Sequence, residues 1–166
     1  MKKILAVVLL SLAVFVVNAQ GLSPKQAFLQ LKKLAGTWEM KGPGGESLKV
    51  IYKVSGAGNT LIETQMPDTS MEMVSVYHMD GKNLMMTHYC AVGNQPSMVY
   101  KPGKDPKVLF FDFVHGTNMK PTDMHIHSAK IMLKGADAIQ SDWIGYLNKK
   151  NAGTTSFELK RVKEVK

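Results

Sequence analysis

The sequence predicts an all-β protein, an up-and-down antiparallel β-barrel of about eight to ten strands with one short helix across one end. Three observations lead to this fold class. Apolar residues at helical spacing stop at Gly36. Short strand-like segments then follow one another, separated by turn residues at fairly regular intervals. Because the connections are short, neighbouring strands should pair in order, and a long meander most simply closes on itself, which removes its edge strands.

The first 19 residues have the pattern of a secretory signal peptide. Lys2 and Lys3 precede an apolar run over residues 4–17, and the small residue Ala19 marks the expected cleavage site. The run is about fourteen residues long, shorter than the roughly twenty that span a bilayer, and an uncleaved anchor is the alternative. We therefore expect a signal peptide over residues 1–19 and a single domain over residues 20–166, secreted or periplasmic, without a membrane span after cleavage.

A short amphipathic helix is predicted next. Ser23 can cap its N-terminus, Pro24 suits the first helical position, and Gln26 completes a capping box. Apolar side chains then recur at helical spacing until Gly36, which supplies a stop.

The rest of the chain is predicted to form about ten short strands. Asp80-Gly81 is a strong signal for a tight hairpin turn. Asn148 to Gly153 is expected to be a loop before the last strand. The strands are expected at residues 37–41, 47–54, 60–66, 71–79, 83–91, 97–101, 107–114, 124–133, 139–147 and 154–162.

Composition excludes some functions and leaves others open. The formal net charge is +8, but the basic residues are scattered and form no stripe interleaved with aromatics, so nucleic acid is not an expected partner. Cys90 is the only cysteine, so no internal disulfide can form and stability must come from packing. All the methionines except Met1 fall in the β region; they suit either an adaptable ligand cavity or ordinary core filling.

Gly36-Thr37-Trp38, directly after the helix, resembles the Gly-x-Trp signature of the calycins, the group of lipocalins and fatty-acid-binding proteins. The resemblance implies a ligand-binding barrel in which Trp38 lies at the closed end beneath an arginine of the last strand, here Arg161. Most of the chain after residue 19, including residues 87–90 and 93–96, further resembles bacterial calycin-like proteins of unknown function, many of them exported. Nitrobindin-type haem barrels share the architecture, but their haem histidine lies near the C-terminus, and no histidine follows His127 here.

Histidines on two strands are the candidate functional side chains. Alternate residues of a strand share a face, so His125 and His127 should point the same way, as should His88 and Cys90. Lys130 prefers water on the opposite face, which predicts that the histidine pair points inward. Three imidazoles and a thiol would then line one lumen, as a set of polar anchors, as ligands for zinc or another transition metal, or as buried polar side chains satisfied within the core.

The leading functional hypothesis is an exported binding protein that holds a small, largely apolar ligand in the lumen. The alternatives are a metal- or haem-binding protein or enzyme that uses the histidines, and a structural envelope protein with a filled core. No catalytic residue is assigned, because the common catalytic motifs do not occur. The expected ligand contacts are His88, Cys90, His125, His127, Met86, Phe111 and Trp143.

Overall fold

The computed structural model of the chain describes residues 21–163, so the signal peptide predicted for residues 1–19 lies outside the described residues. Within residues 21–163 the chain forms one α-helix, α1 (Pro24–Lys32), a short 3-10 turn, η1 (Gly56–Gly58), and ten strands. The strands are β1 (Gly36–Lys41), β2 (Ser47–Ser55), β3 (Thr60–Gln65), β4 (Met73–Asp80), β5 (Asn83–Tyr89), β6 (Gln95–Lys101), β7 (Val108–Thr117), β8 (His125–Leu133), β9 (Ala138–Leu147) and β10 (Lys150–Arg161).

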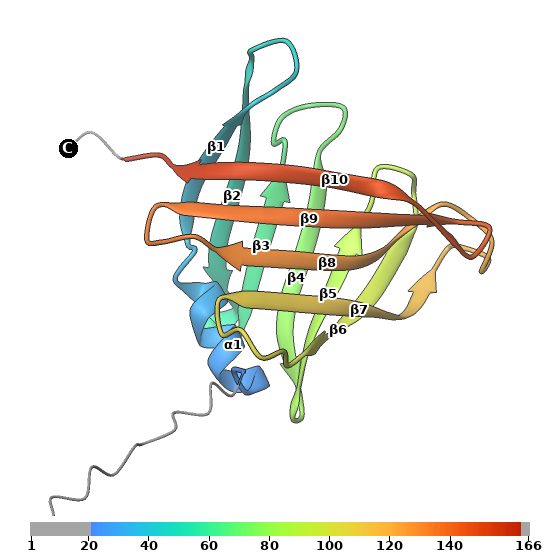
Figure 1. Cartoon of the computed structure of the whole chain (residues 1–166), viewed down its shortest axis with the longest axis horizontal. Coiled ribbons are helices and arrows are strands. Elements are labelled where there is room, and N and C mark those ends of the chain that lie inside the picture. Colours follow the sequence, from blue (N-terminus) through green and yellow to red (C-terminus); the bar gives the residue numbers. More distant parts are fainter. Residues whose placement is uncertain (1–20, 164–166) are drawn as a thin grey trace, which may run out of the picture.

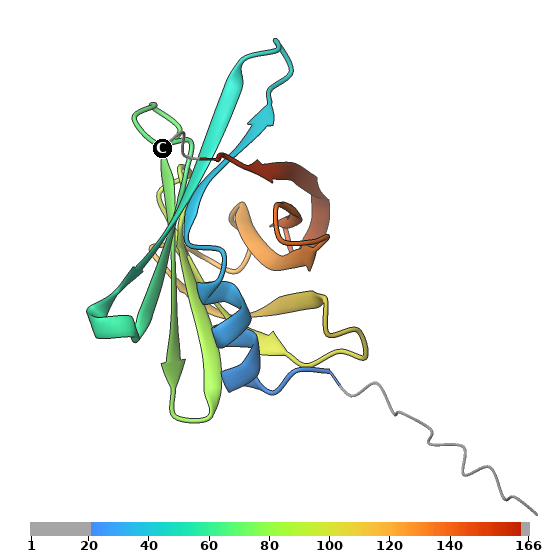
Figure 2. The same cartoon turned by 90° about the vertical axis from the view of Figure 1, so that its left-hand side faces the viewer.

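Each strand pairs antiparallel with the next, and β10 pairs with β1, so the sheet closes into an up-and-down barrel. This confirms the predicted fold class. Strands β7–β10 cross steeply over β1–β5, and α1 lies at the end where the chain enters β1 (Figures 1 and 2).

The predicted capping box starts α1. The Ser23 side chain accepts a hydrogen bond from the backbone N–H of Gln26, and the Gln26 side chain accepts one from the N–H of Ser23. Phe28 and Leu31 point from the helix into the hydrophobic core, so α1 closes one end of the barrel. Among residues 21–163, no helix combines the length and the apolar composition that crossing a bilayer requires.

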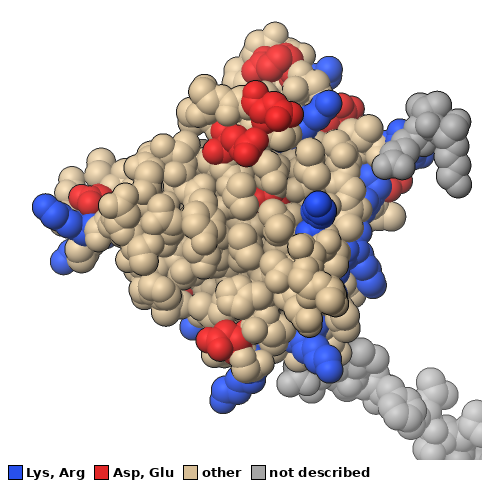
Figure 3. Space-filling model, turned by 180° about the vertical axis from the view of Figure 1, so that it is seen from behind, with Lys and Arg blue, Asp and Glu red and all other residues tan. Residues whose placement is uncertain are grey.

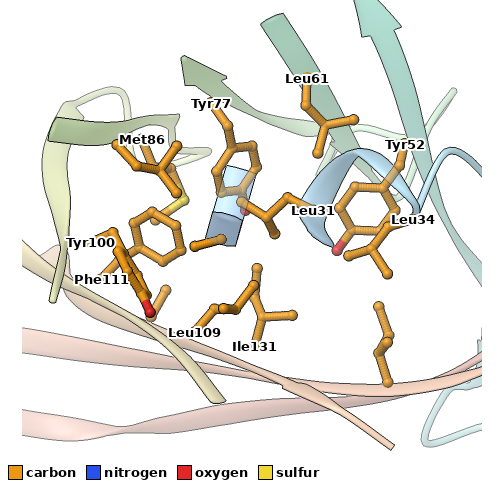
Figure 4. Packing of buried hydrophobic residues seen from close by; sticks show 14 of the residues in the cluster. Leu31, Leu34, Tyr52, Leu61, Tyr77, Met86, Tyr100, Leu109, Phe111 and Ile131 are labelled. Carbon is orange, nitrogen blue, oxygen red and sulfur yellow. The ribbon is translucent and has the colours of Figure 1, made fainter. Parts of the chain in front are cut away.

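The interior near α1 is densely filled. Large inward-facing side chains from both halves of the sheet meet there, and Tyr77 and Phe111 pack edge to face with 5.6 Å between ring centroids (Figure 4). Met86 and Phe111 are fully buried, and Trp143 is 3% exposed.

Trp38 and Arg161 close this end together, as the calycin resemblance implies. They are direct partners in the β1–β10 ladder, and the Arg161 guanidinium carbon lies 4.3 Å from the centre of the Trp38 ring. Gly36 explains the first position of the signature, because its φ is +129° and an added Cβ would lie 2.9 Å from Nη1 of Arg161.

The last strand is longer than expected. Asn148 and Lys149 have φ of +51° and +63° and form a two-residue hairpin turn, so β10 begins at Lys150 and not at Thr154. Gly153 lies at a register shift within the strand, not in a loop. The segment 148–153 is therefore a tight turn followed by a bulge.

The opposite end of the barrel is open, because β1 and β10 pair at only two positions. Beyond Glu39 and Lys160 the two strands separate, and the β1–β2 hairpin stands away from the β9–β10 hairpin (Figure 2). On the side opposite the view of Figure 1, a broad central area carries few charges, and Lys and Arg appear mainly toward its margins (Figure 3).

Candidate functional site

The open end contains a cavity of about 1270 Å³, here called the mouth cavity. It lies between β1–β2, the start of β4 with the loop before it, and β9–β10. Strand alternation explains its apolar walls: Met40 follows buried Trp38 by two residues, and Leu48 precedes buried Val50 by two. The apolar lining consists of Met40, Pro43, Leu48, Met66, Met71, Met73, Ala138, Ile139, Phe157 and Leu159.

Charged side chains surround this cavity at its rim. Glu39, Lys41, Glu158 and Lys160 alternate with the apolar wall residues and are exposed. The mouth cavity is therefore an apolar hollow with charges of both signs at its edge.

A row of polar side chains crosses the barrel interior deeper than the mouth cavity. Tyr52, Glu63, Ser75 and His88 are successive direct partners across β2, β3, β4 and β5. All four are at most 2% exposed. They therefore form one inward-facing polar layer.

Glu63 is the centre of this layer. Its carboxylate accepts hydrogen bonds from the hydroxyl of Tyr77 and, at 2.9 Å, from the amide nitrogen of Gln65. Burial raises the pKa of Glu63, and these two hydrogen bonds offset part of the rise. Within residues 21–163 Glu63 forms no salt bridge, the Arg161–Asp137 pair being the one that the described chain contains.

Gln65 connects this layer to the mouth cavity. It is 1% exposed, and its direct partner in β4 is Met73, which lines the cavity. The amide nitrogen of Gln65 is bonded to Glu63, whereas its carbonyl oxygen Oε1 has no hydrogen-bond partner among the described residues. Such a buried acceptor favours a donor group next to it.

His88 is the one predicted site histidine that points into the barrel. Its Nδ1 lies 2.9 Å from the hydroxyl oxygen of Ser75, and its ring is 4.8 Å from that of Trp143. Burial lowers the pKa of His88 to about 4, so the imidazole is neutral near neutral pH.

His125 and His127 lie at the N-terminal start of β8, and the structure corrects their predicted orientation. The pairing of β8 with β9 passes from Ile126–Gly145 directly to Ser128–Ile144, so His127 is the extra residue of a β-bulge. Because the bulge interrupts the alternation, Ile126 packs against the core, and His125 is opposite Tyr146. The prediction that both histidines share the inward face of Ala129 was therefore wrong.

The two histidines contact each other. His125 Nε2 lies 3.1 Å from His127 Nδ1, and His125 Nδ1 lies 2.8 Å from the carbonyl oxygen of Asp123. The His127 ring stacks on Tyr146 at 3.9 Å and on Phe113 at 5.0 Å. Partial burial and the nearby His125 lower the pKa of His127, while Asp112 acts in the opposite direction.

These rings line a second cavity of about 400 Å³, here called the histidine pocket. It lies where β7 and β8 separate, since their pairing ends at Asp112 and Ser128. Its lining residues are Phe113, His115, Gly116, Met119, Pro121, His125, His127, Tyr146 and Lys149.

The predicted four-member cluster is not assembled. Among residues 21–163, no three His, Cys, Asp or Glu side chains come close enough to hold a metal ion. His88 packs beside Trp143, a buried residue of β9, whereas His125 and His127 pack beside Tyr146, three positions further along the same strand. The structure therefore does not bring His88, Cys90, His125 and His127 together as one set of zinc ligands.

The other predicted contacts have separate environments. Cys90 is a free, half-buried thiol one residue beyond the end of β5, in the turn closed by its N–H bond to the carbonyl of Asn94. Met86, Phe111 and Trp143 belong to the hydrophobic core and do not line the mouth cavity. Contact of these residues with a ligand stays a prediction.

Sequence reasoning missed the polar layer. In the segment 60–66, one face carries Leu61, Glu63 and Gln65 and the other carries Thr60, Ile62, Thr64 and Met66. The second face has more apolar residues, so composition favours it as the inward face, whereas the structure buries the first. The usable signal was Tyr52, which alternates with Val50 and is opposite Glu63 in the β2–β3 hairpin.

No family model matches this sequence, and a search of curated proteins finds no significant match.

Proposed function

We propose that this protein is a calycin-like binding protein, and that it holds a small, largely apolar molecule in the mouth cavity. The observation that carries the proposal is the cavity itself, about 1270 Å³ of open space with mainly apolar walls. Ligand sites typically have about 300–1000 Å³, so a lipid-sized molecule would fit with its outer end at the rim. The closed barrel of ten strands and the Trp38–Arg161 contact are consistent with calycin architecture.

The wall chemistry supports an apolar ligand of variable shape. Met40, Met66, Met71 and Met73 contribute flexible thioether side chains to the lining. Methionine adapts to irregular apolar surfaces, so such walls can accept related molecules of different outline. Phe157 adds a rigid aromatic surface on the β10 side.

Gln65 offers a hydrogen-bond acceptor for a polar group at one end of the ligand. Its unpaired Oε1 lies on the residue directly paired with the wall residue Met73. A ligand hydroxyl or amine that reaches past Met73 would donate to this oxygen, which favours a molecule with an apolar body and a donor head. The signal-peptide pattern of residues 1–19 supports a secreted or periplasmic location for this binding.

A cavity-filling variant tests the proposal. The probe is the neutral fluorescent compound N-phenylnaphthylamine, whose emission rises in apolar surroundings. Met73→Trp, on the cavity wall, should occupy the space and weaken binding of the probe at least about tenfold, the loss of roughly 1.4 kcal/mol. Met85→Trp is the matched control, because Met85 lies on the outer face of β5 beside inward-facing Met86.

Equal binding by the two variants, or no binding by the unmodified protein, would overturn the proposal. If the unmodified protein binds the probe and Met73→Trp weakens that binding, native mass spectrometry of protein isolated from its own source would identify the natural ligand.

A further inference from the structure

We propose that His125, His127 and Met119 form a binding site for one copper(I) ion in the histidine pocket. The site is separate from the mouth cavity and shares no lining residue with it. It does not depend on the proposed function.

The spacing of the two ring nitrogens fits a shared metal ion. His125 Nε2 and His127 Nδ1 are 3.1 Å apart. Two nitrogens that each lie about 2.0–2.1 Å from one metal ion are roughly 3.3 Å apart at a tetrahedral angle. An ion could therefore enter between them with only small movement of the rings.

The backbone carbonyl of Asp123 determines which ring nitrogen of His125 carries the proton. Its Nδ1 lies 2.8 Å from the carbonyl oxygen of Asp123, which can only accept a hydrogen bond. Nδ1 therefore carries the proton, and the lone pair of Nε2 points toward His127. This is the usual arrangement of a metal-binding histidine, whose other nitrogen donates to a carbonyl or carboxylate.

His127 can join without a change in charge. In the metal-free protein its Nδ1–H donates to Nε2 of His125. When copper(I) takes the lone pair of Nδ1, the proton moves to Nε2 of the same ring, so both imidazoles remain neutral.

The fold holds His127 in place for this role. It is the extra residue of the β8 bulge, a feature that redirects one side chain out of the alternating pattern. Stacking on Tyr146 and Phe113 restricts the ring further. A ligand fixed before the metal arrives binds more tightly, since less rotational freedom is lost.

The donor set favours copper(I). A structural zinc ion requires four ligands from histidine, cysteine or carboxylate. His115 also lines the pocket, but no three such side chains of residues 21–163 are placed to hold one metal ion. The additional soft donor on the pocket lining is the thioether of Met119. Thioethers select copper(I), which accepts a combination of imidazole and sulfur ligands.

Copper(I) titration against a competing chelator, under argon, tests the site. All proteins carry Cys90→Ser, because a free thiol would bind copper(I) elsewhere. We expect one copper(I) per chain, with His127→Gln weakening the affinity more than about tenfold. Met119→Leu should weaken copper(I) binding several-fold. His78→Gln, which replaces a histidine of β4 outside the pocket, should leave it unchanged.

Nitrogen NMR of the histidine rings locates the ion independently. Copper(I) should shift the ring nitrogens of His125 and His127 and not those of His78 or His88. Binding that survives His127→Gln, or shifts confined to other residues such as the methionines of the mouth cavity, would overturn the proposal. Binding unaffected by Met119→Leu would overturn the part assigned to the thioether.

Discussion

Arg161 stabilises the closed end of the barrel through several contacts of one side chain. Its guanidinium covers the Trp38 indole, and its Nη1 and Nη2 donate to the carbonyl oxygens of Ala35 and Lys33 at 2.8 and 2.9 Å. These carbonyls follow the last turn of α1, where a positive charge is favourable. One side chain therefore ties together the last strand, the first strand and the helix end.

Arg161→Ala should lower the free energy of unfolding by about 1–3 kcal/mol, because stacking is lost and carbonyl acceptors lose their partners. Urea unfolding measures this loss. A double-mutant cycle with Trp38→Phe should show coupling between the two side chains. Strictly additive losses would contradict an energetic contribution from the stacking contact.

His88 should make the stability of the protein depend on pH. Burial lowers its pKa from 6.5 to about 4. Below pH 6.5 the unfolded chain takes up a proton that the folded chain does not bind. The contribution of His88 is therefore fully present above this pH and is lost as the pH falls toward 4, by about 3 kcal/mol in total.

His88→Gln, which retains a group able to hydrogen-bond Ser75, should reduce this dependence on pH. The measurement is the difference in free energy of unfolding between the two proteins, from about pH 7 to about pH 4. Taking the difference removes the contribution of Glu63, whose raised pKa acts in the opposite direction. A difference that does not change with pH would refute the prediction.

Individual residues differed in how well the sequence predicted them. The contact between Trp38 and Arg161 was expected from the resemblance of Gly36-Thr37-Trp38 to the calycin signature, and the positive φ of Gly36 and the stacked guanidinium give its physical basis. His125 was not, because one bulge residue reverses the facing of every position before it. The mouth cavity was not predictable either, since it depends on where β1 and β10 separate.

The β9–β10 hairpin shows the same limit at the level of an element. Both turn residues, Asn148 and Lys149, adopt positive φ. The sequence Asn-Lys does not predict such a turn, because the usual signal is asparagine followed by glycine. Sequence reasoning therefore placed a six-residue loop, Asn148 to Gly153, where the chain has a tight turn and a bulge. Nine of the ten expected strands overlap observed ones with only small end shifts, whereas β10 gained four residues at its start.

Lys149→Gly should stabilise the protein by about 0.5–1 kcal/mol, because it removes the steric cost of a side chain at positive φ. Thermal unfolding, followed by circular dichroism, measures the change. Lys150→Gly is the control: Lys150 is the first residue of β10 and has no positive φ, so glycine there should be neutral or destabilising. A loss of stability in Lys149→Gly would contradict this account of the turn.

At the scale of the whole molecule, the barrel is unevenly paired. Residues 128–132 of β8 have partners on both neighbouring strands. Residues 154–158 of β10 have partners on β9 but none on β1. Strand β10 is therefore paired on both sides at the closed end of the barrel, whereas at the mouth it is paired on the β9 side alone.

Hydrogen exchange should report this difference. Peptides that cover residues 154–158 should exchange faster than peptides that cover residues 128–132, although both lie in long strands, because part of their backbone has no partner strand. Mass spectrometry of exchanged, pepsin-digested protein measures both segments at once. Equal protection of the two segments would show that β1 and β10 are hydrogen-bonded over more positions than the two that the structure pairs.

The short β1–β10 seam also has a consequence for crowded solutions. Past the seam, each of the two strands presents free backbone groups beside an apolar wall, which is the arrangement that recruits a strand from another chain. Glu39 and Lys41 follow one edge, and Glu158 and Lys160 follow the other, all exposed. A second chain that added to either edge would have to desolvate these ions, so the four side chains act as gatekeepers against strand-by-strand polymerisation.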